Sequence, residues 1–227
     1  MLAAIYDTHG NLPAVEAVLA DAEAAGADRF LLGGDYASLG AWPVETVERL
    51  RELPAVGWLK GNWERWQVSP WEAPDHPFIK AAGEWVREAL GPLAAELGAL
   101  PETVTVDGTL FCHASPVSDM RTFMPQPADD ETELLADVSQ PRVVFGHSHL
   151  QFRRVADGGV ELVNPGSVGL PFDGDQRAAY ALFHPDGVEL RRVTYDHERY
   201  AAEVRQRMGL LGDDMAQRIE AALPPPP

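Results

Sequence analysis

The chain has 227 residues, with 18 Lys and Arg against 35 Asp and Glu, and a formal net charge of −17 at pH 7. Hydrophobic residues make up 45% and charged residues 23%, a composition typical of globular proteins and unlike that of disordered or fibrous chains. The acidic balance argues against a protein that binds long nucleic acids, because these are held mainly by phosphate neutralisation. The single cysteine, Cys112, excludes an internal disulfide and any zinc site built from several thiolates.

The sequence contains no apolar run of the roughly 18–20 residues that a membrane span needs. The N-terminal stretch MLAAIYDTHG also lacks the basic start and long apolar segment of a signal peptide. We therefore expect a cytoplasmic protein without a membrane partner. In the absence of repeats and of Ser- and Gly-rich linkers, we predict one domain over residues 1–222. The proline-rich residues 223–227 cannot continue a helix and are expected to be disordered.

Short apolar runs alternate with helical periodicity in the first sixty residues. Asn11 is a candidate N-cap for a helix that Gly26 ends. Strands are predicted over 2–6, 29–32 and 55–59, and a second helix over 43–53. This succession of strands and helices is typical of an α/β sheet.

Hairpin patterns dominate the rest of the chain, after predicted helices over 78–90 and up to residue 97. Asp107-Gly108 is a strong two-residue turn signal between strands 103–106 and 109–113. A strand is expected over 142–145, and further hairpins pair 152–156 with 160–163 and 178–183 with 188–194. Further helices are predicted over 129–138, 198–208 and 215–222.

Metal-competent side chains follow five of the predicted strands. They occur in Asp7-Thr8-His9, Gly34-Asp35, Gly61-Asn62, Cys112-His113 and Gly146-His147-Ser148-His149. Strand ends at one edge of an α/β sheet are where ligands bind, so we expect these side chains to converge. Two residues apart on an extended segment, Asp7 and His9 are expected to point to the same side, as are His147 and His149. The Cys112 side chain is expected to face the core instead.

Two carboxylates, one amide and four imidazoles form a mixed oxygen and nitrogen donor set. Such a set suits Mn, Fe, Zn, Co or Ni rather than Ca, and we favour manganese. Seven side chains exceed the needs of one tetrahedral site. They fit two divalent ions if one carboxylate bridges both.

The motifs DTHGN (7–11), GGDY (33–36), GNWE (61–64), the isolated His113 and GHSH (146–149) stand in a characteristic order and spacing. In this respect the chain resembles the calcineurin-like metallophosphoesterase superfamily, and within it the small bacterial and archaeal phosphodiesterases that lack a capping domain. NPGSVG (164–169) is also typical of the small members, so the resemblance covers roughly residues 1–195. The resemblance implies a four-layer αββα sandwich with two central mixed β-sheets and a binuclear metal centre on one edge.

The resemblance also assigns the ligands, by matching motif. It implies one ion held by Asp7, His9 and His149, a second held by Asn62, His113 and His147, and Asp35 as the bridge. Asp35, Asn62 and His113 are thereby also expected to take part in catalysis. Two such ions can activate a bridging hydroxide for in-line displacement at phosphorus. The expected activity is hydrolysis of phosphodiester or phosphoanhydride bonds in a small, nucleotide-like substrate.

Trp63 departs from the family's usual pattern, in which a histidine that helps protonate the leaving group often follows the ligand Asn. An indole N–H can donate a hydrogen bond but is not an acid near pH 7, so alkyl monoesters are expected to be poor substrates. Trp63 and Trp66 are candidates for stacking on a nucleobase, the alternative being that they pack beneath the loop. Arg121 is a candidate phosphate ligand, with a surface role as its alternative.

Several alternatives remain open at this stage. A non-catalytic metal-binding scaffold of the same fold is one rival, because the retromer subunit of this fold works through protein contacts. A phosphomonoesterase or protein phosphatase is another, whereas the acidic balance disfavours a DNA nuclease. Self-association is left open. We expect His76 to be a surface residue, and Asn164 and Ser167 to make turn hydrogen bonds.

Overall fold

Ten strands form two five-stranded sheets in the computed structural model, which describes residues 1–224. The first sheet has the order β10-β9-β1-β2-β3, with β1, β2 and β3 parallel and β9 antiparallel to both β1 and β10. Its strands are β1 (Leu2–Ile5), β2 (Arg29–Leu32), β3 (Ala55–Trp58), β9 (Ala178–His184) and β10 (Gly187–Val193).

The second sheet has the order β4-β5-β6-β8-β7. Its three central strands are parallel, and the two edge strands are antiparallel to their neighbours. The strands are β4 (Thr103–Val106), β5 (Thr109–Cys112), β6 (Arg142–Val144), β7 (Phe152–Val155) and β8 (Glu161–Asn164). Both sheets are therefore mixed, as the resemblance implied.

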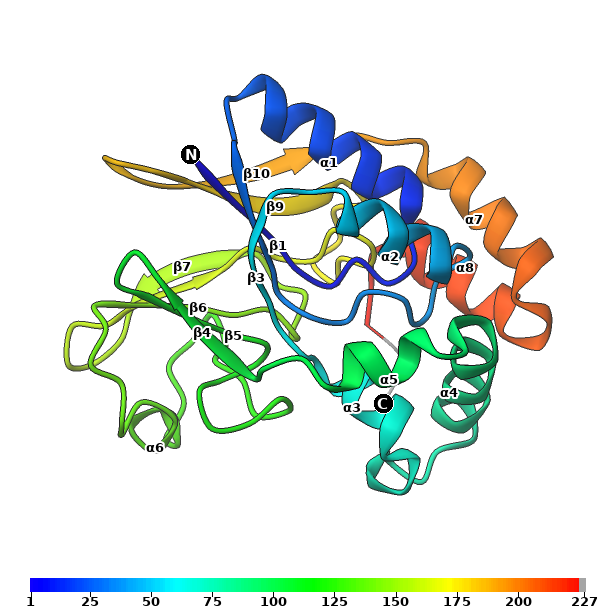
Figure 1. Cartoon of the computed structure of the whole chain (residues 1–227), viewed down its shortest axis with the longest axis horizontal. Coiled ribbons are helices and arrows are strands. Elements are labelled where there is room, and N and C mark those ends of the chain that lie inside the picture. The colour runs from blue at the N-terminus through cyan, green and yellow to red at the C-terminus, as the bar shows by residue number, and fades with distance from the viewer. Residues whose placement is uncertain (225–227) are drawn as a thin grey trace.

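Helices cover the outer face of the first sheet and one end of the molecule (Figure 1). The Asn11 side chain caps the first helix by accepting a hydrogen bond from the Ala14 N–H at 3.1 Å. The helices are α1 (Leu12–Ala24), α2 (Pro43–Arg51), α3 (Asn62–Val68), α4 (Pro77–Leu90), α5 (Leu93–Gly98), α6 (Glu131–Leu134), α7 (His197–Arg207) and α8 (Gly212–Ala221). Short 3₁₀ turns, Pro70–Glu72 and Gly209–Leu211, lie beside them.

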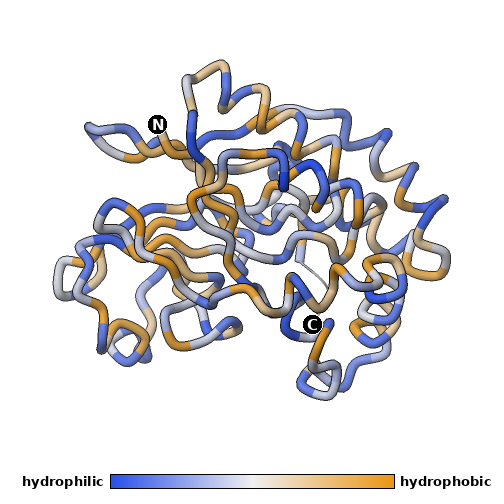
Figure 2. The backbone as a smooth tube through the Cα atoms, viewed as in Figure 1, coloured by the Kyte–Doolittle hydropathy of each residue, from blue (hydrophilic) through white to orange (hydrophobic). Residues whose placement is uncertain are grey.

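Apolar side chains fill the spaces between the layers, and Figure 2 shows hydrophobic stretches concentrated along the strands. Leu31, Phe111 and Val144 belong to the cluster between the two sheets, and Val18 and Leu50 to the one beneath the outer helices. Removing such side chains from water is the main driving force for this layered packing. The four-layer αββα sandwich is therefore confirmed.

The outermost layer on the second sheet is less helical than the sequence predicts. The helix expected over 129–138 is reduced to α6, a single turn at Glu131–Leu134, and a long loop covers the rest of that face (Figure 1). Phe123 and Leu134 from this segment pack on Cys112 and Phe145, so side-chain burial maintains the layer without a regular helix.

Two further expectations concern the chain's surroundings and its tail. Within residues 1–224, no helix combines the length and apolar character that crossing a membrane requires. Of the tail 223–227 that is expected to be disordered, residues 225–227 lie outside the described residues, and residues 223 and 224 follow α8 without regular secondary structure.

Candidate metal centre

Parallel strands of both sheets end just before the predicted ligands. β1, β2 and β3 precede Asp7, Asp35 and Asn62, and β5 and β6 precede His113 and the GHSH segment. Backbone hydrogen bonds join these loops, with His9 N–H donating to Asp35 O at 3.0 Å and Gly146 N–H to His113 O at 2.7 Å. The parallel topology therefore brings all five motifs to one edge.

The ligand backbones adopt a conformation that residues other than glycine rarely use. Asp7, His9, Asp35, His147 and His149 have φ values of 53°, 45°, 56°, 64° and 58°. Such left-handed conformations cost on the order of 1–3 kcal/mol each and concentrate at functional sites. The expectation of an extended backbone was therefore wrong: the side chains converge because the chain turns sharply at each ligand.

Two motif glycines allow the close approach of these loops. A Cβ at Gly61 would lie 2.2 Å from Asp35 Oδ1, and one at Gly146 would lie 2.4 Å from Asp7 Oδ2. Both distances are far below van der Waals contact, so a larger residue at either position displaces a carboxylate.

The first group of ligands comprises Asp7, His9 and His149. One ligand atom from each lies within 4.8 Å of the others, and all three residues are buried. The Nε2 atoms of His9 and His149 are 3.2 Å apart, and His149 Nε2 is 3.6 Å from Asp7 Oδ1. Atoms that share one ion at about 2.1 Å are separated by roughly this distance.

The second group comprises Asp35, His113 and His147, joined by Asn62. The Asn62 amide oxygen is 3.1 Å from His113 Nε2 and 2.9 Å from His147 Nδ1. Asp35 Oδ2 is 3.5 Å from His113 Nε2 and 3.8 Å from His9 Nε2 in the first group. The Asp35 carboxylate therefore lies between the two groups.

Hydrogen bonds on the far side of three imidazoles fix which nitrogen faces the centre. Nδ1 of His9, His113 and His149 donates to the backbone carbonyls of Ser38, Gly33 and Leu170. When Nδ1 carries the proton of a neutral imidazole, Nε2 has a free lone pair. Metal-binding histidines have this arrangement.

More hydrogen-bond acceptors than donors face the space between the candidate ligands. The lone pairs of His9 and His149 face each other, and Asp7 Oδ1 is buried without a hydrogen-bond partner within residues 1–224. Unpaired buried acceptors are costly, and a cation between them satisfies all of them. The donor set and its geometry therefore fit divalent metal ions in both groups.

The imidazoles inside the centre differ in their electrostatics. Burial, reinforced by His149, lowers the pKa of His9 to about 4, and burial with His113 nearby lowers that of His147 to about 4. Burial alone also lowers the pKa of His113, but the Asp35 carboxylate outweighs it and raises the value to about 10. In the absence of metal, a proton on His113 therefore supplies positive charge to the second group.

Glu64, the last residue of the GNWE motif, holds the ligand loops together. Its buried carboxylate accepts hydrogen bonds from the backbone N–H groups of Asp35, Tyr36 and Gly61 at 2.7–2.9 Å. Burial and the nearby Asp35 carboxylate raise the pKa of Glu64 to about 7. Sequence analysis assigns this residue no role, because a glutamate side chain is ordinarily exposed and nothing in the GNWE motif indicates its burial.

Asn164 and Ser167 support the same loops from the second sheet. Asn164 Nδ2 donates to Gly146 O at 3.0 Å, and Ser167 Oγ donates to Asp7 O at 2.7 Å. Asn164 Oδ1 and Ser167 Oγ also accept hydrogen bonds from the N–H groups of Gly166 and Leu170 at 2.9 and 2.8 Å, which are the turn hydrogen bonds that the sequence predicts. Cys112 is also buried, facing the outer apolar layer rather than the ligands.

A cavity of about 620 Å³ lies over His9, Asp35, Asn62, His147 and His149. Its wall comes mainly from α3, the start of α4, α8 and the loop after β8. The apolar wall residues are Leu39, Trp63, Trp66, Phe78, Ile79, Met120, Leu170, Phe172 and Met215, and the polar ones are His76, Asp214 and Arg218. The volume is within the range of small-molecule sites.

The predicted substrate-binding residues divide between this cavity and the outer surface. Trp63 and Trp66 line the cavity, with their rings 5.1 Å apart, although both are also largely buried in the helical core. The Arg121 guanidinium lies elsewhere and donates to Glu133 and Asp130, so the structure does not bring it to the cavity. His76 is exposed as expected, yet it lines the cavity because α4 begins directly after it.

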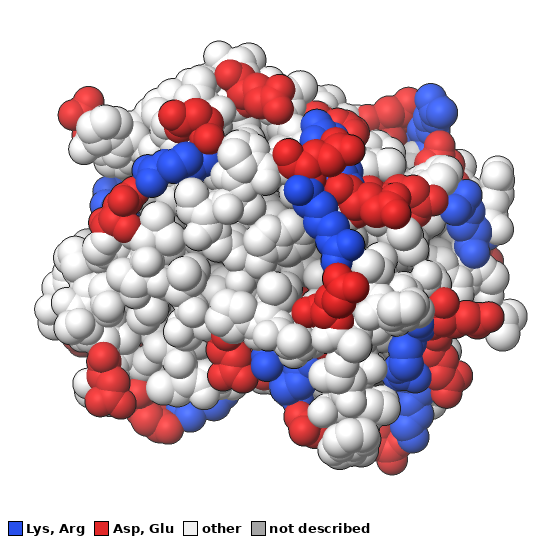
Figure 3. All heavy atoms as spheres, in the orientation of Figure 1, with Lys and Arg blue, Asp and Glu red and all other residues white. Residues whose placement is uncertain are grey.

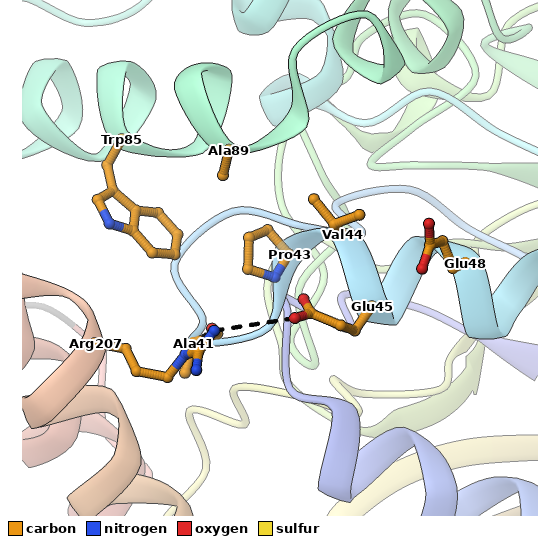
Figure 4. A pocket seen from close by; sticks show the side chains of 8 residues that line it. All are labelled: Ala41, Pro43, Val44, Glu45, Glu48, Trp85, Ala89 and Arg207. Atoms are coloured by element: carbon orange, nitrogen blue, oxygen red, sulfur yellow. Dashed lines mark hydrogen bonds and ion pairs between the residues drawn. The ribbon is translucent and has the colours of Figure 1, made fainter.

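Another hollow, between α2, α4 and α7, contains none of the ligands (Figure 4). Its lining includes Glu45, Trp85 and Arg207, and the Arg207 guanidinium stacks on Trp42 with its carbon 3.7 Å from the ring centroid. The candidate chemistry is therefore confined to the cavity over the ligands.

Comparisons with known proteins agree with this geometry. Residues 1–187 match the sequence model of the calcineurin-like phosphoesterase superfamily domain. An uncharacterized protein of Methanocaldococcus jannaschii is 30% identical over 234 residues, covering 92% of this chain and 93% of that protein.

Solved structures show the same fold over nearly the whole chain. A metallophosphoesterase from Sphaerobacter thermophilus is 28% identical with a TM-score of 0.84, covering 98% of both chains. A hypothetical protein from Pyrococcus horikoshii shares the fold at 19% identity, with a TM-score of 0.81 and coverage of 96% of this chain and 98% of that one. The chain belongs to the calcineurin-like phosphoesterase superfamily.

Proposed function

We propose that this protein is a two-metal phosphoesterase that hydrolyses phosphodiester or phosphoanhydride bonds of a small, nucleotide-like substrate. The observation that carries the proposal is the position of Asp35. Its Oδ2 atom lies 3.8 Å from a ligand of the first group and 3.5 Å from a ligand of the second. A carboxylate between two sets of acceptors suits the bridge of a binuclear centre.

Asp7, His9 and His149 would hold one ion, and Asn62, His113 and His147 the other, with Asp35 between them. When bound, such ions polarise phosphoryl oxygens and lower the pKa of water, which supplies a nucleophile near neutral pH. The chain's own contribution is orientation. The carbonyl partners of the imidazoles and the Glu64 carboxylate keep the ligand atoms aimed inward, so little reorganisation accompanies the reaction.

The backbone N–H of Trp63 donates to Asp35 Oδ1 at 3.0 Å. The first turn of α3 therefore orients the bridging carboxylate. Trp63 also stands in the place of the histidine that often protonates the leaving group in the superfamily, and its indole cannot do so. Leaving groups that are stable as anions, such as aryl oxides or phosphates, are favoured over alkoxides.

The surroundings of the cavity support a small substrate. On the face shown in Figure 3, acidic and basic side chains are interspersed, without a continuous basic surface that could follow a nucleic acid backbone. A binuclear centre of four positive charges, less two carboxylates and one hydroxide, has a charge of about +1. This local charge attracts a phosphoester despite the net charge of −17. Manganese, a cytoplasmic location and self-association stay predictions.

The test is a metal-by-substrate panel on protein stripped by a chelator and reloaded with Mn, Fe, Zn, Co or Ni. We expect metal-dependent hydrolysis of bis-p-nitrophenyl phosphate and of dinucleoside polyphosphates, with slow turnover of alkyl monoesters. Full metal occupancy without hydrolysis of any phosphoester would favour the scaffold. Faster turnover of alkyl monoesters than of diesters would favour a phosphomonoesterase.

A further inference from the structure

The C-terminal helix α8 supplies one wall of the cavity over the ligands. Asp214, Met215 and Arg218 of this helix line the cavity. The match to the superfamily domain ends at residue 187, so this wall comes from a part of the chain outside that match. The ligand motifs of the shared domain therefore do not determine what α8 presents to a substrate.

The Arg218 guanidinium is held in place on two sides. Nε and Nη2 both approach Asp214 Oδ2 at 2.8 Å, and the central carbon lies 5.1 Å from the Phe78 ring centroid. The side chain is only 12% exposed. An arginine fixed in this way loses little further conformational entropy when it binds a ligand.

This ion pair retains hydrogen-bonding capacity beside the cavity. Neither Nη1 of Arg218 nor Oδ1 of Asp214 takes part in a hydrogen bond within residues 1–224. A donor and an acceptor are thus available next to each other on the same helix. Outside the metal ligands, the described charged side chains that line the cavity are these two.

The net charge of the pair decides which ligand chemistry fits. One carboxylate largely neutralises one guanidinium, so the pair is a weak site for a second phosphate. The surrounding Phe78, Phe172 and Ile79 form an apolar environment suited to a flat ring. A flat, neutral ring with a donor beside an acceptor at its edge is a nucleobase.

We propose that Asp214 and Arg218 form a specificity-determining pair that binds the edge of a nucleobase in the substrate, while aromatic side chains of the same cavity wall contact its faces. The proposal rests on the phosphoesterase function proposed above. It extends that function by assigning base recognition to α8, whereas the metal centre binds the phosphoryl group.

The test compares two diesters with the same p-nitrophenolate leaving group: thymidine 5′-(p-nitrophenyl phosphate) and methyl p-nitrophenyl phosphate. The ratio of their kcat/KM values isolates the nucleoside, because the metal chemistry is shared. We expect the wild type to prefer the thymidine ester, and Arg218→Gln to reduce this preference by about 10- to 100-fold, the usual effect of losing hydrogen bonds to a charged group. Arg218→Lys keeps the positive charge but lacks the planar guanidinium with its several N–H donors. It should also lose most of the preference for the thymidine ester.

Arg207→Gln is the matched control, because Arg207 also stacks on an aromatic ring but lines the hollow without ligands (Figure 4). It should leave the preference unchanged. An equal fall in kcat/KM for both esters in Arg218→Gln, or an undiminished preference, would overturn the proposal. Thermal unfolding of each variant identifies a loss that comes from the fold alone.

A binding measurement separates this proposal from the proposed activity. Thymidine, which has no phosphate, is titrated into metal-free protein while the intrinsic tryptophan fluorescence is recorded, to which Trp63 and Trp66 contribute from the cavity wall. Saturable quenching in the wild type and in Arg207→Gln, weakened in Arg218→Gln, supports base binding even if no ester is hydrolysed. Hydrolysis of both esters at similar rates without quenching leaves the phosphoesterase function standing and overturns base recognition by α8.

Discussion

The cavity has a floor, formed by the candidate metal ligands, and a wall, formed mainly by α3, α4 and α8. The two regions differ in backbone conformation and in polarity. On the floor, seven polar side chains from five loops are packed together, and five of them have left-handed backbones. The wall is mostly apolar and comes largely from helices with ordinary backbones, and of its residues Leu39, in a loop, has a left-handed backbone. The floor thus concentrates backbone strain and unpaired acceptors, whereas the wall is stabilised in the same way as the rest of the core.

This difference predicts what substitutions do. A substitution on the floor changes the metal-binding side chains, and therefore the reaction step that all substrates share. Repacking of neighbouring side chains cannot replace a lost ligand atom. A change in the wall alters the choice of substrate and costs stability, because wall residues such as Trp66 also belong to the helical core. Substitutions in the two regions should therefore separate turnover from selectivity.

Asp35→Asn is expected to have the largest effect. It keeps the shape of the side chain but removes the anion between the two groups, so metal content should fall at both and activity by about 10³-fold or more, since metal ions supply several kcal/mol of charge stabilisation. Metal analysis and steady-state kinetics measure both quantities. Near-normal turnover with full occupancy would show that another ligand bridges.

Trp66→Phe should act on selectivity instead. Removing an aromatic ring that stacks on a base costs about 1–3 kcal/mol, and the smaller ring of phenylalanine should lose part of this, so kcat/KM for a nucleotide diester should fall more than that for methyl p-nitrophenyl phosphate. Trp58→Phe is the matched control, because Trp58 packs on Tyr36 in the core beneath the outer helices rather than in the cavity. Equal losses on both substrates would assign Trp66 to the core alone.

Trp63→His should produce a moderate gain on one class of substrate. An imidazole at this position can protonate a departing alkoxide, which an indole cannot. We expect rates on alkyl esters to rise by about 10-fold, with little change for p-nitrophenyl esters, whose leaving groups need no proton. Rates across esters of graded leaving-group pKa measure the effect. A wild type that already hydrolyses alkyl monoesters as fast as aryl diesters would indicate another acid, and His76 in the cavity wall is the first to test.

Asp21→Asn changes a residue in neither region, and its effect on activity and stability should be the smallest of the four. Asp21 on α1 accepts hydrogen bonds from Tyr180 and Arg191 at 2.7 and 2.9 Å. Burial alone would raise its pKa, but these two partners lower it below the usual value. The side chain is 30% exposed, so we expect a loss of only about 0.5–1 kcal/mol of unfolding free energy at pH 7, with unchanged turnover.

The pH dependence of that loss has a definite sign. A carboxyl group with a lowered pKa stabilises the folded state above its unfolded pKa of about 3.9, and this contribution disappears as the pH falls through the folded pKa. Denaturant unfolding of the wild type and Asp21→Asn should therefore show a difference at pH 7 that narrows below pH 4. A difference that stays constant down to pH 2 would point to a packing effect.

The strands and the convergence of the candidate ligands at one edge were largely predictable from the sequence. Each ligand follows an apolar run, and sequence order alone places such runs at a common sheet edge once the strands are parallel. The left-handed turns at Asp7 and His147 were not predictable, because local propensity disfavours them and only the assembled loops impose them. The short helix α3 was missed for a related reason: Gly61 precedes it without a side-chain cap, and Asn62 was identified only as a ligand.

Apart from Trp63 and Trp66, the cavity wall could not be predicted from the sequence. Phe78 and Met215 resemble ordinary core positions on amphipathic helices, and nothing in their spacing indicates that part of each side chain borders a cavity. Arg121 illustrates the converse, since a basic residue near a ligand motif pairs instead with acidic neighbours on its own loop and α6. These partners are only 9 and 12 residues away in the sequence, but the loop that brings them together takes its shape from the packing of Phe123 and Leu134 on the second sheet.

The most direct test of the two-metal centre is the anomalous diffraction of crystals of the manganese-loaded protein, recorded at the manganese absorption edge. We expect two peaks about 3.5–4 Å apart. One should lie among Asp7, His9 and His149, the other among Asn62, His113 and His147, and the Asp35 carboxylate should be within bonding distance of both. A single peak, or two peaks that Asp35 does not join, would contradict the proposed centre.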